Sequence, residues 1–184
     1  MQYFITFFIW VSFLEVCDKE EITMAYLNFK SPIRHMHLAY SALVDRLKCY
    51  LGADWEPSSC VYVYYEDPLV RTHEDVHWCV GTILKNNEED LLSECGDDIY
   101  LVTIPSSQAL QASFPFRNML SYGIGAKKSF DALINKLEEN HMSTENPPIE
   151  IHDFEDNEDI HYYIYLNQND EFQEMMEQPY NKLE

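Results

Sequence analysis

The sequence predicts an α+β fold made of two β-α-β-β repeats, and three observations point to it. The segments DVHWCV (75–80) and DIHYYI (159–164) share the pattern Asp, β-branched, His, aromatic, any residue, β-branched. Each follows a short alternating strand, Val61–Val63 in one case and Ile149–Ile151 in the other, and upstream of each strand lies a helical stripe. A duplicated unit of this kind predicts two halves related by a pseudo-twofold axis, with one antiparallel sheet and both helices on one of its faces.

The first half starts with a strand over Ile22–Phe29, which Pro32 ends. The segment IRHMHLAY (33–40) alternates apolar and polar residues, which predicts a second, half-buried strand. A short helix is expected next, because Leu43, Leu47, Tyr50 and Leu51 fall on one helical face that Gly52 can terminate. Two β-rich runs within 61–84 predict a hairpin, and NNEEDLLSECG (86–96) predicts a brief acidic helix.

The second half repeats this plan. The segment IYLVTIPSSQALQASFPF (99–116) predicts a strand, a Pro-Ser turn and a strand. Phe130, Leu133, Ile134 and Leu137 form the apolar stripe of a helix that ends near Asn140. Within this helical stretch Gly123 and Gly125 are expected to permit close packing rather than to bind phosphate. The final hairpin covers 149–166.

Charge and cysteine content exclude several classes of protein. With 32 acidic and 12 basic residues the formal charge is -20, which would repel a phosphate backbone, so no nucleic-acid partner is expected. Much of the excess lies after residue 138, and 169–184 is expected to be an acidic, solvated tail. The five cysteines are widely spaced without a CxxC pair, which indicates reduced thiols rather than disulfides or a zinc knuckle.

The N-terminal run MQYFITFFIWVSFL has no ionisable side chain before Glu15, which predicts a hydrophobic membrane anchor over 1–17. Fourteen residues are short for a full span, at about 1.5 Å per helical residue against about 30 Å of hydrocarbon. A cleaved signal peptide and a buried apolar segment are the alternatives. The folded domain is expected over 22–168.

The final hairpin predicts a ligand site. Strict alternation puts Ile149, Ile151, Ile160, Tyr162 and Ile164 on the face under the helices. The opposite face collects the candidate ligand-binding residues, which are Glu150, His152, His161 and Tyr163, joined by Tyr62 and Tyr64 from the first hairpin. Aromatic walls around one acid suit a small hydrophobic or cationic molecule. The alternative is an ordinary solvated sheet face.

No catalytic or metal site is expected. His35 and His37 have a chelating spacing on the predicted strand, but no third ligand is identifiable. The sequence contains no GxSxG and no Gly-rich phosphate loop. We therefore predict a non-enzymatic protein without a cofactor or metal.

Several segments resemble, in the same order, the testis-expressed protein 264 family, a group of membrane-anchored proteins with a GyrI-like (SOUL or effector-binding type) domain. They are VYVYYEDP, DVHWCVGTIL, TIPSSQALQASFPF, NMLSYGIGAKKSFDALINKLEEN, PPIEIHDFEDNEDIHYYIYL and DEFQEMME, and together the resemblance covers Ile22–Glu177. It implies a GyrI-like fold in the cytosol, held by a single-pass anchor in the endoplasmic reticulum membrane. It also implies that the acid lining the ligand cavity is Glu150, with His152 in place of the usual Tyr.

The same resemblance implies a receptor for selective autophagy of the endoplasmic reticulum. Such receptors bind a ubiquitin-like autophagy modifier through an aromatic-x-x-aliphatic motif, which adds a strand to the modifier. In this sequence, which stops at Glu184, the candidate motifs are Tyr180 with Leu183 and, less well matched, Phe172 with Met175. The alternative function is binding of a hydrophobic cation by the GyrI-like domain without any role in autophagy.

Overall fold

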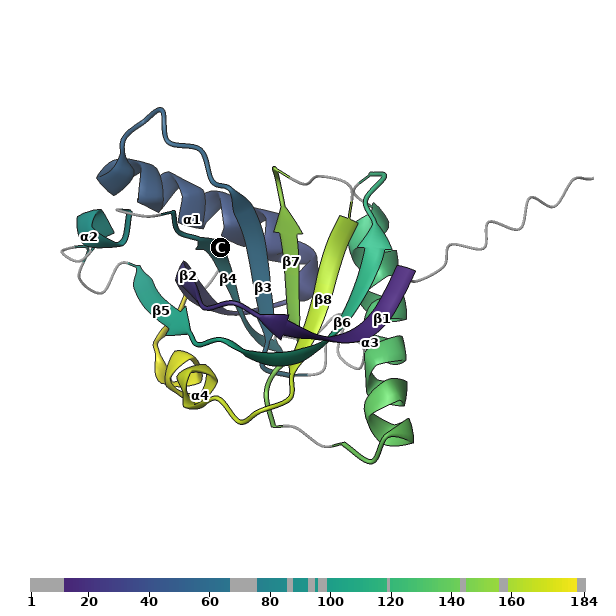
Figure 1. Cartoon of the computed structure of the whole chain (residues 1–184). Coiled ribbons are helices and arrows are strands. Elements are labelled where there is room, and N and C mark those ends of the chain that lie inside the picture. The colour runs from purple at the N-terminus through teal and green to yellow at the C-terminus, as the bar shows by residue number, and fades with distance from the viewer. Residues whose placement is uncertain are drawn as a thin grey trace, which may run out of the picture.

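One large sheet dominates the structure, a computed structural model that describes residues 12–66, 76–85, 88–92, 95, 99–118, 120–142, 145–155 and 159–181 (Figure 1). Its strands are β1 (Ser12–Lys19), β2 (Ile22–Ser31), β3 (Ser59–Tyr64), β4 (Val76–Ile83), β5 (Tyr100–Ile104), β6 (Ser107–Pro115), β7 (Ile149–Asp153), β8 (Asp159–Tyr165) and β9 (Tyr180–Asn181). The helices are η1 (Ile33–His35), α1 (Met36–Leu51), α2 (Glu88–Leu92), α3 (Leu120–Glu139) and α4 (Asp170–Glu177).

The sheet confirms the predicted duplication. Its order is β1-β6-β8-β7-β3-β4-β2-β5, so the strands β6, β8 and β7 of one repeat mirror β2, β4 and β3 of the other. The two repeats meet where β3 pairs antiparallel with β7. In that pair Tyr62 lies opposite Glu150, and these two residues occupy equivalent positions in the repeats. The pseudo-twofold axis therefore passes beside the Tyr62–Glu150 pair.

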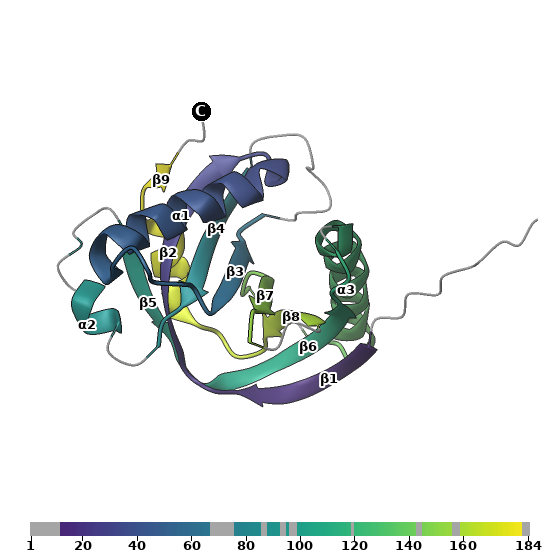
Figure 2. The same cartoon turned by 90° about the horizontal axis from the view of Figure 1, so that it is seen from above.

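A long two-stranded ribbon ties the repeats together. β1 runs on into β2 and β5 runs on into β6, while β2 pairs with β5 and β1 pairs with β6. Seen from above, this ribbon curves from one end of the sheet to the other (Figure 2). The predicted turn near Pro105 thus joins two strands that pair with β2 and β1 rather than with each other.

Helices α1 and α3 lie on one face of the sheet, as predicted, and a gap separates them above β3 and β7 (Figure 2). Helix α1 contacts β2 and β4, and helix α3 contacts β6 and β8. The core under these helices includes Leu43, Trp78 and Phe130. The opposite face, expected to be open, holds a second core that includes Met24 and Val61 and is partly covered by α4.

The strand predicted over 33–40 is wrong, because this segment forms η1 and the start of α1. Ala39, Leu43 and Leu47 are buried at four-residue spacing, so the helical period continues upstream of the predicted helix. The alternation at positions 36, 38 and 40 is only a short stretch, and tertiary packing of the helical face outweighs it. Helix α1 ends at Gly52, whose φ of 107° is accessible to glycine.

The prediction of a single-pass anchor in the endoplasmic reticulum membrane is also wrong. Ser12–Lys19 is strand β1, paired with β6, so the end of the expected anchor belongs to the sheet. Among the residues that the structure describes, no helix has the length and apolarity needed to cross a membrane. The first eleven residues lie outside the described part of the chain.

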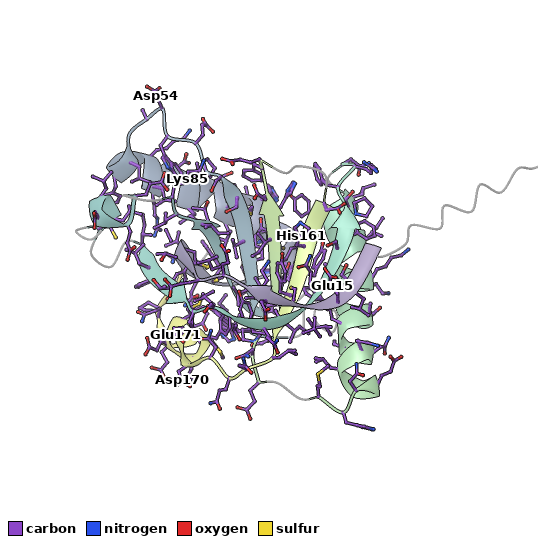
Figure 3. All side chains as sticks on the ribbon, viewed as in Figure 1. Glu15, Asp54, Lys85, His161, Asp170 and Glu171 are labelled. Carbon is purple, nitrogen blue, oxygen red and sulfur yellow. The ribbon has the colours of Figure 1, made fainter. Side chains whose placement is uncertain are left out.

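The C-terminal segment, as far as residue 181 where the described chain ends, packs on the domain instead of forming a solvated tail. Asn169 caps α4, since its side chain accepts a hydrogen bond from the backbone N–H of Glu171. Phe172 and Met175 of α4 are buried in the second core, whereas Asp170 is exposed on the outer side of the helix (Figure 3). A motif that adds a strand to a partner needs an extended and accessible segment, and Phe172 and Met175 offer neither.

Of the other candidate motif, Tyr180 with Leu183, the structure describes only Tyr180. Tyr180 lies in β9, which pairs in parallel with β2, and its hydroxyl donates to the backbone carbonyl of Met176 at 3.0 Å. Leu183 lies outside the described residues.

Candidate functional site

The register of the last hairpin changes the composition of the predicted site. Glu150 of β7 pairs with Tyr162 of β8, so Glu150 shares a face with residues that were assigned to the core. Tyr62 and Tyr64 lie on this same helix-covered face. Four predicted residues therefore stay together, namely Glu150, His152, Tyr62 and Tyr64, and they lie under the gap between α1 and α3.

His161 and Tyr163 are the two predicted ligand residues that the structure places elsewhere. They lie on the opposite face, near β1 and β6 (Figure 3). His161 Nδ1 is 2.8 Å from the hydroxyl of Ser113, and the hydroxyl of Tyr163 accepts a hydrogen bond from Lys19 Nζ at 3.2 Å. The predicted phase put odd-numbered residues of β7 and even-numbered residues of β8 on the face under the helices. It is wrong for β7, because in the observed register the even-numbered residues of both strands share that face.

Glu150 is the buried acid at the centre of the site. Its side chain is 1% exposed, and its Oε2 accepts a hydrogen bond of 2.8 Å from the hydroxyl of Tyr64. Its Oε1 has no hydrogen-bond partner in the part of the chain that the structure describes. Burial raises the pKa of the Glu150 carboxyl to about 8, and the hydrogen bond from Tyr64 only partly opposes this shift.

Phenol groups surround the carboxyl. Burial and the nearby Glu150 carboxylate both raise the pKa values of Tyr62, Tyr64, Tyr122 and Tyr162. The hydroxyl of Tyr162 is buried without a hydrogen-bond partner among the described residues. Two unsatisfied polar atoms, one on Glu150 and one on Tyr162, are thus buried in one small region, which is unusual for a region with only a packing role.

A cavity of about 510 Å³ opens into the gap between the two helices. Its walls come from η1 and α1 on one side and from Tyr122 and Gly123 of α3 on the other, and its floor includes Cys60 and Tyr62 of β3. Tyr62 lies beside Glu150 across the strand pair, and Cys60 lies beside His152. Glu150 itself is not among the lining residues, but its strand partner Tyr62 is, so the acid lies next to the floor of the cavity.

Tyr40, Tyr122 and Phe154 line this cavity, and the rings of His152 and Phe116 pack against them. The ring of His152 lies 4.5 Å from that of Phe116 and 5.3 Å from that of Phe154, measured between centroids. Tyr40 of α1 contacts Phe154 edge to face, and the hydroxyl of Tyr122 is hydrogen-bonded to Nδ1 of His152. This arrangement suits a flat or bulky apolar molecule with a positive charge.

Sequence reasoning missed Tyr40, Phe116 and Tyr122 as site residues. Tyr40 was placed on a strand, and Tyr122 belongs to a helix whose predicted apolar stripe began only at Phe130. The duplication could have indicated them, because two equivalent helices on one face leave a gap over the symmetry axis, and residues that border this gap are candidates for a site. Gly123 also lines the cavity, and a Cβ placed there would meet no atom within 4 Å, so the expected close packing holds at Gly125 alone.

Metal ligands are not assembled in the described residues. No group of three or more His, Cys, Asp or Glu side chains is placed to hold a metal ion there. His35 and His37, which were expected on a strand, lie instead in η1 and in the first turn of α1.

Comparison with known proteins links this geometry to a fold. No family model and no curated protein matches the chain. Among solved structures it is similar to the C-terminal domain of EcmrR, with a TM-score of 0.57 and 11% identity over 84% of this chain and 97% of that one. EcmrR in a complex with DNA also matches, with a TM-score of 0.58 and 13% identity over 84% of this chain and 57% of that one. The expected absence of nucleic-acid binding stays a prediction.

Two further structures show the same likeness. A hydrolase from Listeria innocua has a TM-score of 0.54 and 10% identity over 84% of this chain and 91% of that one. SAV2435 bound to tetraphenylphosphonium has a TM-score of 0.50 and 8% identity over 84% of this chain and 93% of that one. Together with the two β-α-β-β repeats, these matches show that the chain has the GyrI-like, effector-binding type of α+β fold.

Proposed function

We propose that this protein binds a small hydrophobic cation in the cavity between α1 and α3, and that it does so without catalysing a reaction. The observation that carries the proposal is the buried Glu150 carboxyl, which lies next to the floor of an aromatic cavity and has one oxygen unsatisfied among the described residues. The likeness to SAV2435 in its tetraphenylphosphonium complex supports the same class of ligand.

Binding is expected to release a proton. Because burial raises the pKa of Glu150 to about 8, most of the carboxyl is protonated at pH 7 in the unliganded protein. A cation in the cavity favours the ionised form and so lowers this pKa. The affinity should therefore rise with pH up to about 8, by at most about tenfold per pH unit, and level off above it.

Calorimetric titration with tetraphenylphosphonium tests the proposal. Repeating it at pH 7 in two buffers of different ionisation enthalpy gives the number of protons released, which we expect to approach one. Glu150→Gln should weaken binding about tenfold or more at pH 9 and abolish proton release. Glu138→Gln makes the same change at an exposed position on α3 and should alter neither quantity. Equal affinities for Glu150→Gln and the parent protein would refute the role of the acid.

The autophagy-receptor role implied by the resemblance to the testis-expressed protein 264 family is not part of this proposal. The segment predicted as the membrane anchor joins the sheet from Ser12 onward. Phe172 and Met175 of one candidate autophagy motif are buried. The binding function rests only on residues inside the described domain.

A further inference from the structure

The basic side chains that line the cavity contrast with the acidic character of the protein as a whole. The formal charge is -20, yet the described residues lining the cavity include no carboxylate, and their basic side chains are Arg34 of η1 and His37 of α1. Both are exposed at the solvent side. The first turn of α1, which carries His37, contains no acidic residue.

The other polar groups near them are already used within the chain. The hydroxyl of Tyr40 donates to the carbonyl of Ser59 at 3.0 Å, and Ser41 Oγ donates to the carbonyl of His37, also at 3.0 Å. Arg34 donates from its Nε to Nε2 of His35 at 3.3 Å, and its two terminal guanidinium nitrogens have no hydrogen-bond partner among the residues that the structure describes, so they can serve an external acceptor. The outer end of the cavity is thus a donor site, while Glu150 lies beside Tyr62 of the cavity floor.

We propose that the natural ligand has two poles, with a positive charge on its apolar body and an anionic group, such as a carboxylate or phosphate, that binds Arg34 and His37. This inference rests on the proposed function and specifies its ligand class. Arg34 presents a planar pair of donors that matches such an oxyanion. The same charge repels a cation that lacks the anionic group, so Arg34 is a specificity-determining residue.

Two phosphonium compounds separate this inference from the proposed function. Tetraphenylphosphonium has only the cationic apolar body, whereas 4-carboxybutyl-triphenylphosphonium adds a carboxylate on a flexible arm. We expect the full-length protein to bind the carboxylated compound about tenfold more tightly at low salt, and this ratio to fall as salt increases.

Arg34→Gln should reduce the ratio of the two affinities to near one, chiefly by weakening the carboxylated compound and slightly strengthening the other. Lys48→Gln removes the same charge from α1 outside the cavity lining and should leave the ratio unchanged. Equal affinities for both compounds in the parent protein, or a ratio that Arg34→Gln does not change, would overturn the two-pole ligand while leaving cation binding in place. Failure of both compounds to bind would instead overturn the proposed function, and this inference with it.

Discussion

Glu150→Gln should stabilise the protein, and the gain should depend on pH. The substitution keeps the size of the side chain and an acceptor for the hydroxyl of Tyr64, but it removes a carboxyl that ionises in the core. Below the pKa of the unfolded chain both proteins have an uncharged group at this position. Their free energies of unfolding should then differ little.

The magnitude follows from the pKa of Glu150, which burial raises from 4.5 to about 8. Between these values the folded state keeps the proton and the unfolded state has released it, so the parent protein loses stability as the pH rises. Each pKa unit corresponds to about 1.4 kcal/mol. The variant should therefore gain about 1.4 kcal/mol per pH unit over the parent, reaching about 5 kcal/mol above pH 8.

Urea unfolding at a series of pH values between 5 and 9 measures this difference, with intrinsic tryptophan fluorescence, to which the buried Trp78 contributes, as the probe. Other carboxylates titrate over part of this range in both proteins, so the quantity to follow is the difference between variant and parent. Glu138→Gln, at an exposed site, should differ from the parent by less than about 0.5 kcal/mol at every pH. A constant difference for Glu150→Gln across the range would show that the carboxyl has an ordinary pKa in the folded state.

Three further predictions concern packing. Phe172→Ala should cost about 3–5 kcal/mol in urea unfolding, because Phe172 of α4 is buried in the second core. A loss below about 0.5 kcal/mol would mean that this segment is a solvated tail. Gly125→Ala should lower Tm, since a Cβ there would lie 2.7 Å from the hydroxyl of Tyr162. Gly123→Ala on the same helix should raise Tm, because a Cβ there meets no atom within 4 Å and alanine favours the helix. Equal shifts in Tm for the two variants would contradict the packing of α3. Asn28→Ala should speed hydrogen exchange of the α4 amides, because the buried side-chain amide of Asn28 donates to two backbone carbonyls at the end of that helix, at 2.6 and 3.1 Å. Unchanged exchange would show that these two hydrogen bonds do not hold α4 in place.

The duplicated architecture was predictable from the sequence because hydrophobic periodicity and the repeated Asp-x-His pattern are local signals. They located β2, the hairpin of β3 and β4, the stripe of α3 and the final hairpin. They failed at 33–40, where three alternating apolar residues suit a strand but the longer helical stripe through Leu43 and Leu47 decides the structure.

The candidate site was predictable only in part, since strand register depends on the loop between strands. Glu150, His152, Tyr62 and Tyr64 follow from the repeat itself, because β3 and β7 are equivalent strands that meet at the axis. To predict the face on which His161 and Tyr163 lie, one must know the relative phase of β7 and β8, and a shift of one residue moves these side chains to the other face. The aromatic residues of α1 and α3 required the position of two helices over the sheet, which no local pattern encodes.

The pairing of Tyr62 with Glu150 has a consequence for how a ligand lies in its cavity. Two identical repeats would surround the axis with identical groups, and an elongated molecule could then enter in either of two opposite directions with equal affinity. Here a phenol occupies the position in one repeat that a carboxyl occupies in the other, so the two directions differ in energy. Divergence of the duplicated halves thus converts a degenerate cavity into one that holds its ligand in a single orientation.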